Sequence, residues 1–453
     1  MSFATIILLL GDCACAVIAL LTGHFVRFDT APDLYEFFVG DGLDLAFFIV
    51  IVTFASYLME LYDTQKKLRK REIFVRSLVA AAVSFFLLSS LFYIMPFLKF
   101  GRGLLLLSLL NFVFFQFLWH IIHKYVHELS IERRVLVIGT GPLAKLIGGL
   151  IVTTNHTHKL AGYFGCCRET IEVPGECIIG SGEEGIVEAA RRENAEKIVI
   201  SLTERRGSIP LRDLMDCKFS GIEVTDAPSF YEQVTGKLLL ESITPGWFIF
   251  SNGFKVTRPA RAFKRIFDKI LSCIGVIVTL PLFPLIALAI KATSPGPVLF
   301  RQVRTGKHEK EFVLYKFRTM RTNAETNTGA VWAQKDDPRV TPVGKFLRKS
   351  RLDELPQLFN VLKGDMSFIG PRPERPEFVE KLKERIPYYS HRHFVKPGIT
   401  GWAQIKYPYG ASVEDALEKL RYDLYYIKNL SITLDLLIFF ETIKVILYSR
   451  GGR

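Results

Sequence analysis

Four long apolar segments near the start of the chain constrain its fold more than any other feature. They cover about residues 3–26, 43–61, 75–97 and 104–122. A helix needs roughly 20 apolar residues to cross a hydrocarbon core about 30 Å thick, and each segment is long enough. The first has neither the basic start nor the small-residue cleavage pattern of a signal peptide. The sequence therefore predicts a four-helix transmembrane bundle over residues 1–125.

The loops between these segments carry opposite charges. The loop before the second segment is acidic, and the loop after it is basic, with Lys66, Lys67, Arg69, Lys70, Arg71 and Arg76. Because basic loops stay on the cytoplasmic side, we expect both ends of the bundle and everything after His123 in the cytoplasm. His120, His123 and His127 recur at helical spacing where the fourth segment ends. This favours an interfacial anchor over a metal site.

Composition narrows the class of partner. The net charge of +13 predicts anionic partners such as phosphates, nucleotides or acidic lipid headgroups. Nucleic acid is not expected, because the basic residues are interleaved with apolar segments and form no separate basic domain. The seven cysteines are odd in number and lack the paired spacing of a zinc site. We interpret them as reduced packing residues.

A soluble section follows over about residues 130–250. Arg134–Ile138 has the pattern of a buried parallel strand that runs into the glycine-rich turn Gly139–Ala144, and Lys197–Leu202 resembles a later strand. This arrangement predicts a Rossmann-like α/β domain. The acidic residue that would bind a ribose is not evident in Leu160–Gly165. A structural or regulatory role is therefore favoured over a nicotinamide site.

A fifth apolar segment, at about residues 270–290, differs from the first four. It is entered through Arg258, Arg261, Lys264, Arg265 and Lys269 and left through Lys291. Pro281 and Pro284 interrupt it, and proline bends a helix by removing a hydrogen bond. The pattern predicts a re-entrant helix over about residues 264–292, with snorkelling cations at both ends. A kinked spanning helix is the alternative, and the sequence leaves it open.

The run Ser350–Leu362 places two carboxylates, Asp353 and Glu354, side by side in a basic region. The residues predicted to form the inward face of a short helix are Leu355, Leu358, Phe359 and Leu362. Pro356 suits the first turn of that helix. Carboxylates stay ionised and phosphates bind at such a helix start, although a simple N-cap is the alternative. Cationic stretches suited to phosphate contacts surround the pair, at residues 300–306, 315–320, 346–349 and 371–374.

The chain from about residue 258 to 453 carries a set of specific motifs. They are Lys264-Arg265-x-Phe267-Asp268, Thr293–Val298, Tyr315–Met320, Leu352–Leu358, Gly370–Pro373, Lys396–Gln404 and Tyr422–Tyr426. On these motifs the chain resembles the bacterial polyprenyl-phosphate sugar phosphotransferases, also called monotopic phosphoglycosyl transferases. With its four apolar segments and Rossmann-like section, it is similar to the large members that initiate exopolysaccharide or O-antigen repeat units. The resemblance implies a compact α/β catalytic domain over residues 258–453, with a re-entrant membrane helix. It also implies a multi-pass protein of the bacterial inner membrane whose catalytic domain faces the cytoplasm.

The resemblance further implies a two-step transfer of a sugar-1-phosphate from a UDP-sugar to undecaprenyl phosphate. Asp353 would attack the sugar-bearing phosphorus, release UMP and hold the phosphosugar as an acyl phosphate, which the acceptor then takes. Glu354 would orient or deprotonate the acceptor. A Mg²⁺ ion held by Asp353 and the diphosphate would neutralise developing charge.

The resemblance also implies roles for residues at positions that match the motifs of the family. The phosphate- and nucleotide-binding candidates are Arg301, Lys316, Arg318, Arg348, Arg372 and Asp423, of which Asp423 matches an acidic family position near the metal or nucleotide. The residues that match the re-entrant helix and its anchoring entrance are Lys264, Arg265, Asp268 and Pro281. One departure is Ile405–Gly410, which stands where smaller members carry an Asn-Gly-Arg segment. The residues that would read the nucleotide base are therefore not specified.

Two other functions were weighed against transfer. A membrane-anchored nucleotide-sugar dehydratase or epimerase needs a Tyr-x-x-x-Lys pair beyond the cofactor turn, and the match Tyr62–Lys66 lies upstream of it. A non-catalytic scaffold of the polysaccharide machinery would explain the absent cofactor acid but not the motifs around Asp353. The expected partners include inner-membrane lipids. A homodimer and downstream glycosyltransferases stay open, as does the sugar.

Overall fold

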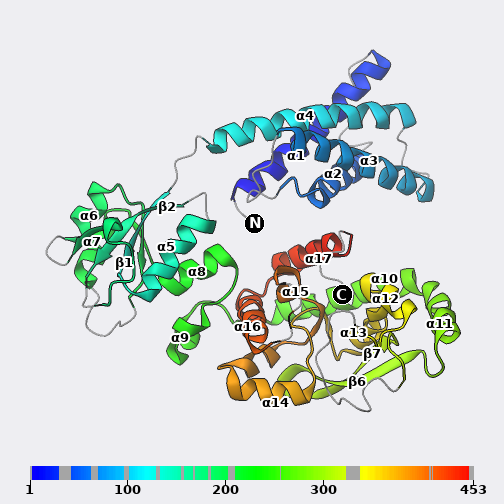
Figure 1. Ribbon diagram of the computed structural model, residues 1–453. Helices are drawn as coiled ribbons and strands as arrows, with labels where there is room; N and C mark the ends of the chain where they lie inside the picture. The colour runs from blue at the N-terminus through cyan, green and yellow to red at the C-terminus, as the bar shows by residue number, and fades with distance from the viewer. Residues whose placement is uncertain are drawn as a thin grey trace. The chain divides into compact units, whose positions relative to one another are not determined.

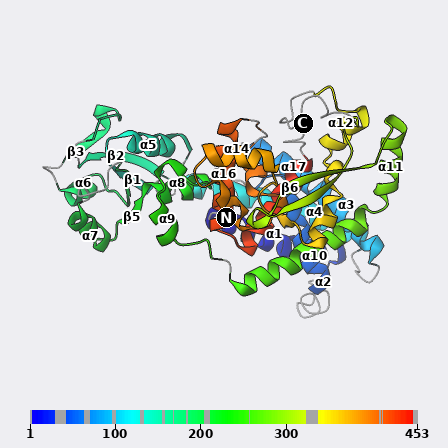
Figure 2. The same cartoon turned by 90° about the horizontal axis from the view of Figure 1, so that it is seen from below.

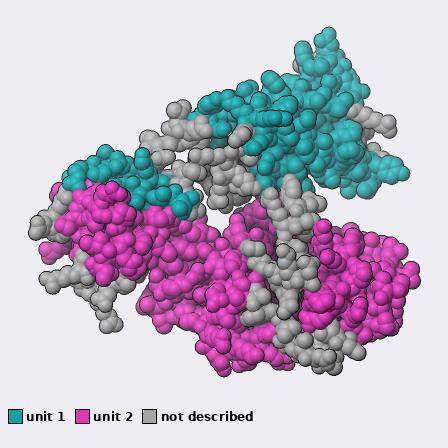
Figure 3. Space-filling view, viewed as in Figure 1, with its two compact units in different colours: residues 1–136, 151–161, 190–197 teal, residues 137–150, 162–189, 198–453 magenta. Residues whose placement is uncertain are grey.

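The computed structural model describes residues 3–29, 42–62, 70–95, 101–128, 133–154, 158–166, 169–181, 185–202, 210–255, 257–322, 337–407, 410 and 412–447. Contacts divide the chain into two compact units (Figure 3). The first contains residues 1–136, 151–161 and 190–197, and the second contains residues 137–150, 162–189 and 198–453.

Four apolar helices form the N-terminal part (Figure 1). They are α1 (Phe3–Phe28), α2 (Gly42–Leu58), α3 (Lys70–Ile94) and α4 (Arg102–Glu128). Three of them, α1, α3 and α4, hold stretches of 24 or 25 residues that are apolar enough to cross a membrane, whereas α2 has 17 residues and is shorter. The structure thus bears out three of the four expected spans by length and composition. The loops at 30–41 and 63–69, which supply most of the charges behind the predicted orientation, lie outside the described residues.

A buried polar cluster lies inside this bundle. Asp12 is fully buried and accepts hydrogen bonds from Tyr62 Oη at 2.7 Å and from Gln116 Nε2 at 2.6 Å. His120 Nε2 lies 3.2 Å from Asp12 Oδ1 and is also buried. A buried carboxylate needs polar partners, and His120 supplies one to Asp12. The interfacial position expected for His120 stays a prediction. The side chain of His127 lies outside the described residues.

The middle section contains a five-stranded sheet with the order β3-β2-β1-β4-β5. The strands are β1 (Arg133–Ile138), β2 (His158–Gly165), β3 (Ile178–Ser181), β4 (Lys197–Ile200) and β5 (Glu223–Asp226), and the helices are α5 (Pro142–Thr154), η2 (Gly175–Cys177), α6 (Ile186–Arg192) and α7 (Leu211–Phe219). β2 and β3 pair in parallel, and the strand order is that of the doubly wound nucleotide-binding sheet. The expected Rossmann-like arrangement is confirmed, including the strands at β1 and β4.

The glycine-rich turn between β1 and α5 is filled by a carboxylate of the chain itself. Glu169, in the loop after β2, accepts hydrogen bonds from the backbone N–H groups of Thr140 at 3.1 Å and Gly141 at 3.3 Å. A helix start of this kind favours an anion. An acidic residue, Glu169, therefore does follow the second strand. Its carboxylate binds the backbone N–H groups of the glycine-rich turn and is itself the anion that those donors favour.

A connecting segment precedes the C-terminal domain. It contains α8 (Ala227–Thr235), η3 (Leu240–Ser242) and α9 (Pro245–Phe250). Leu238, Leu240 and Ile243 are buried in the same hydrophobic core as Leu420 and Leu424. This segment therefore belongs to the core of the C-terminal domain, although it lies upstream of the motifs described above.

The C-terminal domain is a compact arrangement of short helices around two small sheets. Its elements are α10 (Arg258–Thr279), α11 (Leu282–Thr293), β6 (Leu299–Thr305), η4 (Lys307–Glu309), β7 (Glu311–Phe317), α12 (Pro342–Lys349), η5 (Leu352–Glu354), α13 (Gln357–Lys363), β8 (Ser367–Ile369), α14 (Pro376–Arg385), η6 (Tyr389–Phe394), β9 (Gly398–Thr400), α15 (Trp402–Lys406), α16 (Val413–Lys428) and α17 (Ile432–Leu447). β6 and β7 form an antiparallel hairpin, and β8 pairs in parallel with β9.

α10 and α11 form a bent apolar pair, visible in Figure 2 as two helices that turn at their junction. The bend is 61°, and Pro281 stands at the N-cap of α11. Large apolar side chains of α10, such as Ile270 and Ile277, are exposed. The bend that the prolines predict is confirmed, and its geometry suits either a broken span or a re-entrant helix.

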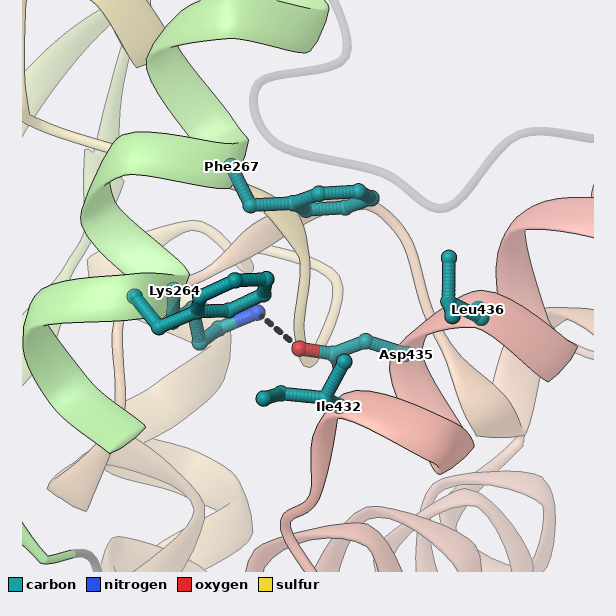
Figure 4. A pocket seen from close by; sticks show the side chains of 6 residues that line it. Lys264, Phe267, Ile432, Asp435 and Leu436 are labelled. Carbon is teal, nitrogen blue, oxygen red and sulfur yellow. Dashed lines mark hydrogen bonds and ion pairs between the residues drawn. The ribbon is translucent and has the colours of Figure 1, made fainter. Parts of the chain in front are cut away.

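The entrance of α10 is tied to the rest of the domain by buried polar contacts. Asp268 accepts hydrogen bonds from Ser367 Oγ at 2.8 Å and from the backbone N–H of Phe368 at 3.0 Å. Lys264 Nζ donates to Asp435 Oδ2 of α17 at 2.9 Å. A small pocket beside this pair is lined by Phe263, Lys264, Phe267, Ile432, Asp435 and Leu436 (Figure 4). These residues fasten α10 to the rest of the domain, whereas Arg265 is exposed.

Candidate active site

The acid pair lies in a tight turn between two short helices. α12 ends at Lys349, and Arg351 then adopts a left-handed conformation, with a φ of 59°. Asp353 and Glu354 follow in the 3₁₀ turn η5, and Pro356 is the N-cap of α13. The sequence predicted one helix that starts at the pair. The structure instead has the 3₁₀ turn η5 at the pair, and α13 begins only at Gln357. Both carboxyl groups are buried.

Apolar residues on either side hold this turn in place. Leu352 and Leu355 pack on a core cluster that contains Ile286 and Ile290 of α11. Leu358 is buried as expected, but Phe359 is 42% exposed, so the predicted inward face is wrong at that position. Because the residues on either side of the acid pair share this cluster with α11, the pair lies beside α11 of the bent helix pair.

Glu354 is held by cations from three segments. Its Oε1 accepts hydrogen bonds from Arg372 Nη2 at 2.9 Å and Lys316 Nζ at 3.1 Å, and Arg351 Nη1 lies at 3.8 Å. Burial alone would raise the pKa of Glu354, but Arg372 and Lys316 hold that pKa well below its usual range. Glu354 is therefore ionised, and its orientation is fixed.

Asp353 has a different environment, although it is the next residue. Burial is the largest influence and raises the pKa of Asp353, and the charge of Glu354 adds to this. The field of Lys316, Arg348 and Arg372 opposes the rise only in part. None of the hydrogen bonds among the described residues ends on its carboxylate. Asp353 is therefore the more basic acid of the pair, and its oxygens are available to a reacting atom.

Three of the predicted cations converge on this pair. Lys316 and Arg372 contact Glu354 directly, and both influence Asp353 electrostatically. Arg348 acts on Asp353 through its charge, while its Nε donates to Thr319 Oγ1 at 2.9 Å. Such a cluster of fixed positive charge around a carboxylate can stabilise charge that develops on a transferred phosphoryl group.

Arg301 lies on the other face of the β6–β7 hairpin. Arg301 pairs with Tyr315, and its guanidinium lies 5.8 Å from that ring. Lys316 pairs with Phe300 and so belongs to the opposite face, because side chains alternate along a strand. Arg304 shares the Lys316 face and donates to the carbonyl of Pro373 at 3.1 Å. The structure thus brings Arg304, and not Arg301, toward the site.

Arg318 and Asp423 are buried away from direct contact with the acid pair. Arg318 donates to the carbonyls of Pro295 at 2.7 Å and Ser294 at 2.8 Å, so it supports the turn after α11. Asp423 lies 2.8 Å from Arg392 Nη2. Burial raises the pKa of Asp423 to about 6, against the opposing charge of Arg392.

Three residues that the sequence did not single out support the site. Arg392 donates to the backbone carbonyl of Arg372 at 3.0 Å. Gln404 Oε1 accepts from Arg372 Nη1 at 3.1 Å. Asn360 is fully buried and joins α13 to β7, because its Nδ2 donates to the carbonyl of Val313 at 2.7 Å. A polar residue inside an apolar helix face was the available signal for Asn360; Arg392 carried none.

The donors around Asp353 suit a metal that arrives with substrate phosphates. Among the described residues, no group of three or more His, Cys, Asp or Glu side chains could hold a metal. Mg²⁺ commonly uses one or two carboxylates together with waters and substrate phosphates. Asp353 can supply one such carboxylate, since the cations do not engage it directly. The chemistry of the site therefore fits a shared metal and not a resident protein cage.

Comparison with known proteins identifies the same region. The family profile described as bacterial sugar transferase matches residues 259–449. The UDP-N-acetylgalactosamine-undecaprenyl-phosphate N-acetylgalactosaminephosphotransferase of Aeromonas hydrophila is 45% identical over 243 residues, which is 53% of this chain and 56% of the relative. The undecaprenyl-phosphate glucose phosphotransferase of Komagataeibacter xylinus is 35% identical over 345 residues, or 74% of this chain and 62% of the relative. This chain thus spans less than two thirds of either relative.

A third relative is covered almost completely. The exopolysaccharide production protein PSS of Rhizobium leguminosarum bv. phaseoli is 43% identical over 185 residues, which is 40% of this chain and 92% of that protein. The profile match contains the acid pair, its cations and the bent helix pair. The chain therefore belongs to the bacterial sugar transferase family.

Proposed function

We propose that this protein transfers a sugar-1-phosphate from a UDP-sugar to undecaprenyl phosphate and releases UMP, as the first membrane step of exopolysaccharide or O-antigen synthesis. The observation that carries the proposal is the acid pair, in which Asp353 is basic and unengaged while Glu354 is locked between cations. The names of the relatives from A. hydrophila and K. xylinus support the class of acceptor and donor.

In the first step, a carboxylate oxygen of Asp353 attacks the phosphorus that bears the sugar. The bond between that phosphorus and the bridging oxygen breaks, and UMP leaves with the electron pair. The phosphosugar stays on Asp353 as an acyl phosphate, which is ordinary covalent catalysis. Lys316, Arg348 and Arg372 surround Asp353 and stabilise the negative charge that grows on the transferred group.

In the second step, a phosphate oxygen of undecaprenyl phosphate attacks the same phosphorus, and Asp353 leaves as a carboxylate. A general base works best when its pKa lies near the working pH. The pKa of Glu354 is held far below that range by Arg372 and Lys316. Of the two roles considered for Glu354, orientation is therefore favoured over deprotonation: it fixes Lys316 and Arg372 around the reacting group.

Mg²⁺ bound between Asp353 and the diphosphate would supply further charge neutralisation. The nucleotide- and phosphate-binding roles proposed for Lys316, Arg348 and Arg372 do not depend on it. Arg318 and Asp423 would support this site through the turn and the Arg392 contact described above. Arg301, on the far face of the hairpin, would reach only a distal part of the nucleotide.

The proposed lipid acceptor determines how we expect α10 and α11 to lie in the membrane. The phosphate of a polyprenyl lipid lies at headgroup level, so the acid pair would also lie at that level. α11 packs on Leu352 and Leu355, which flank the pair. We propose that α10 and α11 enter and leave through the same face, with the C-terminal domain in the cytoplasm beside its nucleotide donor.

Replacing Asp353 with Asn tests the proposal. Asp353→Asn should lower UMP release by on the order of 10⁴ or more, because it removes the nucleophile. The assay measures UMP release from UDP-glucose, UDP-galactose and UDP-N-acetylgalactosamine, with undecaprenyl phosphate in membranes. Asp365→Asn is the matched control, since Asp365 pairs with Lys363 at 3.1 Å, outside the acid pair.

Two further readouts make the test specific. Wild-type protein given sugar-labelled donor without acceptor should carry the label on Asp353, and thermal unfolding should show that Asp353→Asn is folded. Full activity in Asp353→Asn would instead favour the scaffold alternative. The dehydratase alternative has little support, because Tyr62 donates to Asp12 inside the helix bundle and Glu169 fills the cofactor turn.

A further inference from the structure

A glycine at the end of α8 contacts Trp402 of the C-terminal domain. Gly236 caps α8 in a left-handed conformation, with a φ of 67°. Its carbonyl accepts a hydrogen bond from Trp402 Nε1 at 2.7 Å. A Cβ at Gly236 would lie 3.2 Å from the Trp402 ring. Both the conformation and the close approach therefore require glycine here.

Trp402 belongs to the same single helical turn as Gln404. α15 runs from Trp402 to Lys406 and has five residues. The Trp402 ring is 7% exposed and stacks on Tyr425, with ring centroids 5.8 Å apart. Because one short turn carries both residues, a shift of the Trp402 ring also shifts Gln404.

Gln404 continues the connection to the acid pair. One terminal nitrogen of Arg372 donates to Gln404 Oε1 at 3.1 Å, and the other donates to Glu354 Oε1 at 2.9 Å. The planar guanidinium has a fixed fork geometry, so fixing one nitrogen orients the other. Gln404 therefore sets the angle at which Arg372 meets the acid pair.

The segment around Gly236 is itself anchored. Glu232 accepts hydrogen bonds from Lys428 and from Asn429 Nδ2, the latter at 2.9 Å. Lys237 pairs with Glu418, and the backbone N–H of Leu238 donates to the carbonyl of Arg421. Movement of α8 would therefore be passed on to α15 and α16 and not absorbed by a loose linker.

We propose that Trp402 and Gln404 are positioning residues, which relay the placement of α8 to Arg372 and so let the middle section set the rate of the chemical step. This inference rests on the proposed transfer function. It predicts a lower turnover, because Gln404 fixes the nitrogen of Arg372 opposite the one that contacts Glu354. Binding of the UDP-sugar should change little.

The central variant is Trp402→Phe, which keeps an aromatic ring against Tyr425 but removes the N–H that contacts Gly236. We expect kcat for UMP release to fall about fivefold, with a nearly unchanged KM for the UDP-sugar that wild-type protein uses best. The matched control is Trp119→Phe, which also loses a hydrogen-bonded indole N–H, the donor to the carbonyl of Leu8 at 3.3 Å, but lies in the N-terminal helix bundle. It should keep the wild-type kcat and KM.

Gln404→Leu provides an independent test, because it leaves the contact between Trp402 and Gly236 in place. It should reproduce the lower kcat with a nearly unchanged KM. The double variant should be no slower than Gln404→Leu alone, because both residues act through Arg372. If Trp402→Phe fails to fold, Gln404→Leu still decides.

The outcomes separate this inference from the proposed function. Wild-type kcat in either folded variant would overturn the relay, as would a KM that rises in parallel with the loss of kcat, or additive losses in the double variant. Wild-type protein that releases no UMP from any of the three UDP-sugars would instead remove the proposed function itself.

Discussion

Asp353 and Glu354 are adjacent in the chain, yet their surroundings push their protonation in opposite directions. Glu354 makes direct ion pairs with Lys316 and Arg372, whereas Asp353 is buried and feels those charges only at a distance. Two carboxylates with divergent pKa values commonly serve different roles in one site. The raised pKa of Asp353 is consistent with the nucleophile that we propose, and the lowered pKa of Glu354 with the proposed orienting group.

The ionisation of Asp353 should govern the acid limb of the pH profile. The nucleophile must be a carboxylate, so kcat should rise with pH through a pKa above the ordinary value of 3.8. Glu354→Gln removes a neighbouring negative charge that raises the pKa of Asp353, and should therefore move the acid limb to lower pH. The measurement is the burst of UMP release at a series of pH values. An acid limb that stays in place in Glu354→Gln would contradict the assignment.

Stability should respond to pH with opposite signs at the two acids. The folded-state pKa of Asp353 is raised, so its contribution favours the folded protein at low pH and is lost as pH rises through that pKa. The pKa of Glu354 is lowered, so its contribution is present above about 4.5 and is lost as pH falls. These opposing terms partly cancel in the wild-type protein.

At the residue scale, residue type and motif were enough to predict the acid pair and the cations that meet it. They could not distinguish Arg301 from Arg304, because that choice depends on the register in which β6 pairs with β7. Nor could they find Arg392, whose contact with the Arg372 carbonyl joins residues 20 positions apart through the tertiary fold.

At the scale of elements, proline chemistry predicted the bend between α10 and α11, and the structure has a bend of 61°. The sequence could not say whether the pair spans the membrane, and the bend angle suits both arrangements. Periodicity was also insufficient at the acid pair, because the predicted helix is divided into the 3₁₀ turn η5 and α13, which begins at Gln357.

Accessibility of Lys310 should distinguish the two arrangements. Lys310 is exposed and follows α11 in the chain. In a protein with all native cysteines replaced, Lys310→Cys should react with a membrane-impermeant maleimide only after the cells are permeabilised, because a re-entrant pair returns the chain to the cytoplasm. The cysteine-free parent is the control for background labelling. Labelling in intact cells would show that α10 and α11 span the membrane.

At the scale of the whole molecule, the Rossmann-like section was predictable from its glycine turn and strand pattern, but its link to the catalytic core was not. The family profile begins at residue 259, while the core of the C-terminal domain includes Leu238, Leu240 and Ile243. No local pattern marks these three residues as part of a distant core, because their partners lie in α16.

Truncation should expose this dependence. A fragment of residues 258–453 lacks the three buried aliphatic side chains, and each such loss typically destabilises a core by about 2–5 kcal/mol. We expect it to unfold at a clearly lower temperature than a fragment of residues 226–453, when both are measured in the same nanodiscs. Equal midpoints would show that the upstream segment adds nothing to the core.

Chimeric sugar transferases would meet the same constraint. Leu238, Leu240 and Ile243 pack inside the core of the C-terminal domain, so a junction placed at residue 259, where the family profile begins, would leave part of that core behind. Exchange of membrane anchors between family members should therefore succeed when the junction lies before Ala227. The transplanted C-terminal domain then retains Leu238, Leu240 and Ile243 in its core.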